Sequence, residues 1–120
     1  MLLVGLVLIG AAPGLADNGY LWDGTHWTDK QMTQDIKVAY IKGVGNMADF
    51  EVAMGGTGRA FCISKAFVDE LKAKQVSQII QEVDKFYREN PTRLNTSVLE
   101  VVLRRCTNLC PPETKTGEKK

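Results

Sequence analysis

The chain is short and nearly neutral. Its 120 residues include 15 Lys and Arg against 14 Asp and Glu, a formal net charge of +1, and this length limits it to one domain with a modest core. The charges form neither the basic stripe typical of nucleic-acid-binding proteins nor the long acidic block typical of disordered solubilising segments, so we expect no nucleic-acid partner.

The first residues have the pattern of a secretory signal peptide. An apolar run from Leu2 to Ile9 is followed by small residues up to Ala16, as in an h-region and its cleavage site. The run is shorter than the roughly 20 apolar residues of a membrane span. We expect residues 1–16 to be removed on export to the periplasm or the exterior, which leaves no stable membrane span. The glycines and the proline of this segment disfavour the alternative, a buried N-terminal helix.

The next segment, residues 17–27, has no apolar periodicity but is rich in aromatic side chains. We expect an extended N-terminal arm whose rings pack on the domain. A first helix is predicted at about 28–49, because Thr28 and Gln31 match a capping box. Apolar residues then recur at steps of three and four, as in an amphipathic helix: Met32, Ile36, Tyr40, Val44 and Met47.

Glycines mark two features of the following sequence. Gly43 and Gly45 lower the helix propensity, and we interpret them as packing positions that let another helix approach closely. Residues 50–59 are glycine-rich and predicted to form a flexible loop, which lacks the preceding strand and the Lys-Ser or Lys-Thr pair of a phosphate-binding loop. Because this loop is the segment least committed to the core, Met54 and Arg59 are the predicted anchors for a protein partner.

Three further helices are expected in the C-terminal half. Apolar residues before and after residues 73–75 define two faces that point in different directions, so a short helix at 65–72 precedes a long one at 75–89. Pro91 ends the long helix. A last helix at 92–108 is expected to pack antiparallel on it.

The predicted fold is therefore all-α. We expect a small bundle of three to four helices in a single domain of residues 17–110, with the N-terminal arm and one disulfide. Residues 111–120 begin with two prolines and continue with charged and polar residues, which predicts a disordered, solvated tail.

The sequence contains no recognisable catalytic set. Ser64, Ser77 and Ser97 fit helix caps or helix surfaces, and His26 lies in the aromatic arm without an evident partner. Three cysteines and this one histidine do not match the ligand spacing of a zinc site. We therefore predict no enzymatic activity, no cofactor and no metal.

The three cysteines predict one disulfide in an oxidising compartment. Cys62 is expected to pair with either Cys106 or Cys110, which lie one helical turn apart on the same face of the last helix. A bond of this kind closes a loop of about 45 residues and contributes on the order of 3–4 kcal/mol.

Five short motifs in order resemble one family of small exported proteins. They cover about residues 40–110 and comprise AYIKGV (39–44), FCIS (61–64), QII with VDKFY (78–80 and 83–87), NPTRL (90–94) and LCP (109–111). The family is the Tai-type immunity proteins, also called resistance-associated proteins. Its members are helical, periplasmic and typically dimeric, and the founding members bind and block amidase toxins of type VI secretion systems.

The resemblance implies several properties of this chain. By the family pattern Cys62 pairs with Cys110, which leaves Cys106 as an additional thiol, and a homodimer is expected. Ser64 replaces the family's proline, and residues 65–74 are longer than its usual connection. The family's toxin contacts are loop residues that do not map onto this chain, so no binding residue is carried over.

The leading functional hypothesis is an exported, non-enzymatic helical protein that binds another protein. Its sharpest form is an immunity protein that inhibits a peptidoglycan amidase. One alternative is an acid-stress chaperone of the Hde type, which exposes an apolar surface when its carboxylates become protonated. Another is a carrier that holds a small apolar ligand between its helices.

Overall fold

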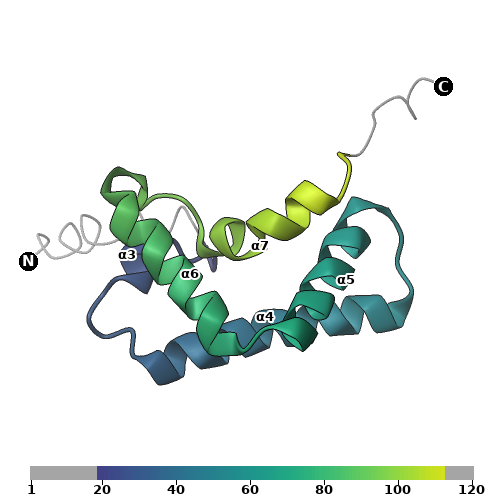
Figure 1. Ribbon diagram of the computed structural model, residues 1–120, viewed down its shortest axis with the longest axis horizontal. Helices are drawn as coiled ribbons and strands as arrows, with labels where there is room; N and C mark the ends of the chain where they lie inside the picture. The colour runs from purple at the N-terminus through teal and green to yellow at the C-terminus, as the bar shows by residue number, and fades with distance from the viewer. Residues whose placement is uncertain (1–18, 113–120) are drawn as a thin grey trace, which may run out of the picture.

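The computed structural model describes residues 19–112, and this part of the chain is all-α as predicted (Figure 1). The predicted signal peptide and residues 113–120 of the predicted tail lie outside the described residues. The elements in chain order are α3 (Gly24–Trp27), α4 (Gln34–Met54), α5 (Gly58–Ala73), α6 (Val76–Glu89), the 3-10 helix η1 (Pro91–Arg93) and α7 (Val98–Leu109).

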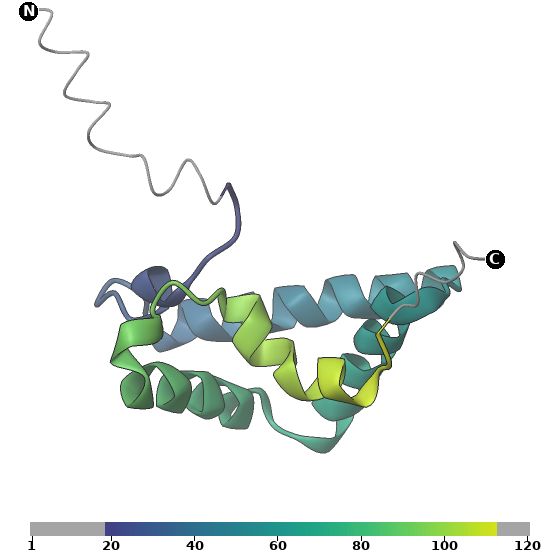
Figure 2. The ribbon, with the colours of Figure 1, turned by 90° about the horizontal axis from the view of Figure 1, so that it is seen from above.

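The four long helices form an open arrangement. Figure 1 shows α4 along the long axis of the molecule, with α6 over its N-terminal part, α5 over its C-terminal part and α7 between them. The chain turns at η1, and α7 then splays away from α6 towards α5 (Figures 1 and 2). It packs against both of these helices. The predicted packing of the last helix on α6 is present, but α7 runs across from α6 to α5 rather than antiparallel along α6 (Figure 1).

The first long helix begins later than the predicted 28–49. The capping box is formed by Asp23 and His26 at the N-terminus of the one-turn helix α3, and the Thr33 hydroxyl caps α4 by accepting from the Ile36 N–H. The Thr28 hydroxyl instead donates to the carbonyl of Gly24 at 2.7 Å. The predicted arm thus contains a helical turn, because side-chain hydrogen bonds to nearby backbone favour this turn over an extended chain or a longer α4.

The predicted loop at 50–59 is wrong. α4 continues to Met54 and α5 begins at Gly58, so only Gly55, Gly56 and Thr57 connect them. Gly55 adopts the left-handed conformation (φ 75°) that ends many helices. The predicted start of the next helix at residue 65 is also too late. Ser64 lies inside α5, where its hydroxyl donates to a Glu51 carboxylate oxygen at 2.7 Å.

The C-terminal half agrees better with the sequence. The prediction of a helix at 75–89 is confirmed within one residue by α6. The predicted 92–108 helix is divided into η1 and α7, and Ser97 caps α7 by accepting from the Glu100 N–H at 3.0 Å. The corner between them is tied to α6, because the Tyr87 hydroxyl donates to the Thr96 carbonyl at 2.6 Å.

The core joins the N-terminal arm to all four long helices. Trp27 is fully buried, and its indole N–H donates to Asp84 of α6 at 2.7 Å. Asp84 also pairs with Lys37 of α4 at 2.9 Å. The packing expected for the arm is thus confirmed at Trp27, whereas Tyr20 and Leu21 are exposed. The other large buried side chains include Ile41, Phe67, Ile79, Ile80, Val83, Tyr87, Val98 and Val102.

Replacement of Ile80 by Asp is expected to unfold the domain. Ile80 is 1% exposed, and an unpaired buried carboxylate costs several kcal/mol, comparable with the whole stability of a small domain. Lys85→Ala, at an exposed position on the same helix, should change the free energy of unfolding by less than about 0.5 kcal/mol. Thermal unfolding followed by circular dichroism measures both, and equal shifts would contradict the assigned face of α6.

Two glycine-to-alanine substitutions should have opposite effects. A Cβ at Gly24 would lie 2.5 Å from Tyr87 Cε1 and 2.9 Å from Leu94 Cα, so Gly24→Ala should cost about 1–3 kcal/mol through overpacking. A Cβ at Gly43 meets nothing within 4 Å, so Gly43→Ala should stabilise the protein by about 0.5–1 kcal/mol through helix propensity. Urea unfolding measures both, and a neutral Gly24→Ala would refute the close contact with Tyr87.

Candidate protein-binding surface

Helix α4 has apolar residues on two opposite sides. One side, with Ile41, Gly45 and Ala48, is buried in the domain. A Cβ at Gly45 would lie 2.5 Å from Leu71 Cδ1 of α5, so the predicted role of this glycine in close helix packing is confirmed. Gly43 has no such neighbour. At 100° per residue, the side of α4 that contains Gly43 points away from the buried side.

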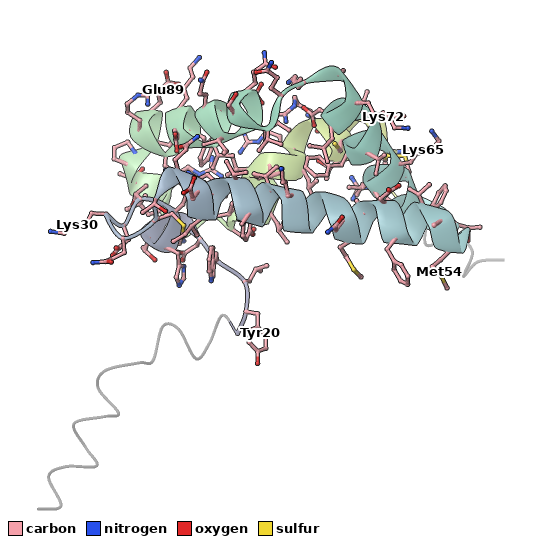
Figure 3. All side chains as sticks on the ribbon, turned by 90° about the horizontal axis from the view of Figure 1, so that it is seen from below. Tyr20, Lys30, Met54, Lys65, Lys72 and Glu89 are labelled. Atoms are coloured by element: carbon pink, nitrogen blue, oxygen red, sulfur yellow. A yellow bond between two sulfur atoms is a disulfide. The ribbon has the colours of Figure 1, made fainter. Side chains whose placement is uncertain are left out.

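The outer face of α4, defined here as Met47, Phe50 and Met54, is apolar and exposed. Their exposed fractions are 66%, 58% and 68%. Steps of three and four residues place all three on one line along the helix. Figure 3 shows Met54 near the C-terminal end of α4, on the side away from α6. The polar residues Lys42, Asn46 and Asp49 are exposed beside this line, so the outer face has an apolar centre and a polar edge, as protein interfaces commonly do.

A shallow groove continues this apolar surface. It has a volume of about 220 Å³ and lies between α4, α5 and α7. Met47 belongs to both the groove and the outer face of α4. The other lining residues are Val44, Ala48, Ile63, Ser64, Phe67, Leu99 and Leu103. A partner could therefore insert a side chain into this groove and also pack along the outer face of α4.

The two residues predicted as partner anchors are in different environments. Met54 belongs to the outer face of α4. Arg59 lies in the first turn of α5 and is half-buried, and its Nη2 donates to the Thr107 carbonyl of α7 at 3.2 Å. Arg59 thus connects α5 to α7 and does not lie in a loop. The sequence reasoning missed Phe50 because it ended the helix at residue 49, and it placed Met47 on the core side.

The disulfide joins Cys62 and Cys110, as the family resemblance implies. Their Cα atoms are 5.9 Å apart, and 48 positions separate them in the sequence. The bond holds the end of α7 against the first half of α5. In the chain-entropy model a loop of this length contributes about 4 kcal/mol. The side chain of the neighbouring Leu109 is 75% exposed.

A ring of four charged side chains joins α5, α6 and α7. Lys74 Nζ lies 3.1 Å from Glu70 and 2.9 Å from Glu82, and Arg105 lies 2.6 Å from Glu70 and 2.8 Å from Glu82. Hydrogen bonds to the two carboxylates raise the pKa of Lys74. Each charge of the ring therefore has two opposite partners, which holds the three helices in register.

The remaining cysteine, Cys106, is a buried thiol next to this ring. Its Sγ lies 3.7 Å from Glu70 Oε1. Burial, together with the negative charge of Glu70, raises the pKa of Cys106 to about 11. Since the thiolate is the reactive form, this thiol is held in its unreactive state.

Three other points bear on function: whether residues 19–112 hold a metal site, whether they include a membrane-spanning helix, and whether known proteins resemble the chain. In this part of the chain, no three or more His, Cys, Asp or Glu side chains are grouped so as to hold a metal ion. No helix in the same range is both long and apolar enough to cross a membrane. Comparison with known proteins provides no relative, since no family model, curated protein or solved structure matches the chain.

Cys106 is expected to resist alkylation in the native protein and to react quickly after unfolding. Between about pH 9 and pH 11 the unfolded thiol ionises while the folded one stays protonated. The contribution of Cys106 to the free energy of unfolding is therefore complete below pH 9 and is lost as the pH rises to 11. Cys106→Ala should flatten this part of the stability–pH curve, and rapid iodoacetamide labelling of the native protein at pH 8 would contradict the assignment.

Proposed function

We propose that this protein is an exported, non-enzymatic helical protein that binds another protein through the outer face of α4. The observation that supports this most directly is the exposure of Met47, Phe50 and Met54 on a helix whose opposite side is already buried. In its sharpest form the proposal is an immunity protein that inhibits a peptidoglycan amidase delivered by a type VI secretion system.

The geometry of the outer face suits a helix that binds in a groove of its partner or packs against a helix of its partner. Met47, Phe50 and Met54 occupy positions i, i+3 and i+7, the anchor spacing of helix-in-groove complexes. Methionine adapts to irregular apolar pockets, and phenylalanine adds a large rigid contact area. Gly43, one turn earlier on the same side, leaves room for a partner backbone to approach closely.

Two observations support export and the immunity role. The Cys62–Cys110 disulfide is typical of proteins in oxidising compartments. The five motifs over residues 40–110 resemble the Tai-type immunity proteins. Alternatively, a second copy of the chain occupies this face in a homodimer. The mass of the protein in solution distinguishes a homodimer from a monomer that binds another protein.

A second candidate function, an acid-stress chaperone, is favoured by the ring of four charged side chains. Protonation of Glu70 and Glu82 would leave Lys74 and Arg105 as adjacent, uncompensated cations between α5, α6 and α7. Separation of these helices would expose apolar core surface. An apolar dye that binds the protein at pH 2 but not at pH 7 would support this role, and the absence of dye binding at pH 2 would exclude it.

Phe50→Glu and Met54→Glu test the binding face. Each should weaken inhibition of the amidase at least tenfold, because a buried unpaired carboxylate opposes an apolar contact. Leu109→Glu is the matched control, since it places the same charge at an equally exposed apolar position on α7. Peptidoglycan hydrolysis measured by turbidity reports inhibition, and light scattering reports the mass.

The outcomes separate the forms of the proposal. Failure of the unaltered protein to inhibit the amidase would refute the immunity role. Inhibition that survives Phe50→Glu would move the binding site away from α4. A mass of two chains that falls to one chain in Phe50→Glu, but not in Leu109→Glu, would identify a second copy as the occupant of the face.

A further inference from the structure

A second surface of the molecule presents two arginines over one phenyl ring. The guanidinium carbon of Arg104, on α7, lies 4.8 Å from the centre of the Phe86 ring, and that of Arg93, on η1, lies 5.5 Å from it. The three side chains line a surface hollow of about 470 Å³ together with Glu82, Lys85, Glu89, Asn90 and Arg105. We call this hollow the Phe86 hollow.

The charges of the Phe86 hollow are not balanced within the described chain. Arg105 pairs with Glu70 and Glu82. Among residues 19–112, neither Arg93 nor Arg104 forms an ion pair, and each contacts the face of the ring instead. Such a cation–π contact leaves the N–H groups at the edge of a guanidinium available for an anion. Two cations therefore converge on one hollow and neither is paired with a carboxylate, although Glu82 and Glu89 also line it.

We infer that the Phe86 hollow binds a carboxylate of an acidic peptide segment from a protein partner. Guanidinium groups recognise carboxylates through paired, charge-assisted hydrogen bonds. Phe86 holds two such groups from different elements close to one ring, which reduces the side-chain freedom lost on binding. The inference goes beyond the proposed function, because Glu89 of this hollow and Met54 of the outer face of α4 lie at opposite corners of the molecule (Figure 3).

The same surroundings disfavour other anions. Glu82 and Glu89 also line the hollow, and their charge opposes a doubly charged phosphate more strongly than a singly charged carboxylate. A nucleic acid or an anionic membrane requires an extended basic surface, whereas the net charge of this chain is only +1. A short acidic segment matches both the size and the charge of the site.

The test uses the full chain and an acetylated, amidated octapeptide of alternating Glu and Gly, with a Gln–Gly peptide as its neutral counterpart. The side-chain N–H signals of Arg93 and Arg104 should shift in NMR spectra with the Glu peptide and not with the Gln peptide. Arg93→Gln and Arg104→Gln should each weaken binding about tenfold through loss of a charge-assisted hydrogen bond. Arg88→Gln removes the same charge from an exposed position on α6 outside the hollow and should change affinity less than twofold.

Phe86→Leu provides a second variant that keeps every charge. Loss of the ring should weaken peptide binding about as much as loss of one arginine, and thermal unfolding checks that the fold is retained. The inference is overturned if the Glu peptide does not shift the two arginine signals, or if Arg88→Gln weakens binding as much as Arg104→Gln does. Tighter binding of inorganic phosphate or of phosphatidylglycerol vesicles at the same signals would overturn the peptide assignment.

Discussion

The contact between α5 and α7 is the interaction on which the rest of this structure depends. α7 is the last element, and the corner at η1 directs it away from α6, so its far end needs another support. The Cys62–Cys110 disulfide supplies it, with the Arg59–Thr107 hydrogen bond beside it. One turn earlier, Arg105 reaches Glu70 of α5. Because α7 is held at this end, its side chains can line both the apolar groove beside α4 and the Phe86 hollow.

The two apolar sides of α4 differ in burial. The side with Ile41 and Ala48 is covered by α5 and α6 and supplies part of the core. The outer face of α4 does not add to the core of the isolated chain, because its side chains remain in water. Exposed apolar side chains on one line of a helix are typical of interaction surfaces, and their burial by a partner would add to the stability of the complex rather than of the domain.

The charged residues are also used in two ways. In the ring of Glu70, Lys74, Glu82 and Arg105, every charge has opposite partners on neighbouring helices, and the adjacent Cys106 is kept as a protonated thiol by burial. Around Phe86, arginines from η1 and α7 contact an aromatic ring and form no ion pair within residues 19–112. The exposed apolar face of α4, with Met54, and the arginines around Phe86, near Glu89, thus lie at opposite corners of the molecule (Figure 3).

The sequence by itself determined the all-α class, helix α6 and its end before Pro91, because regular apolar spacing, helix propensity and a proline act within a few residues of the chain. Long-range contacts decided the rest. The N-terminal arm is held by Trp27, which is fully buried and hydrogen-bonded to Asp84 of α6, 57 positions away in the sequence. The glycines after Met54 show that a helix ends but not that only three residues separate it from the next. Periodicity placed Met47 on a single apolar side of α4 and missed the buried side with Ile41 and Ala48, because the packing of α5 and α6 determines which side is covered and which remains exposed to solvent.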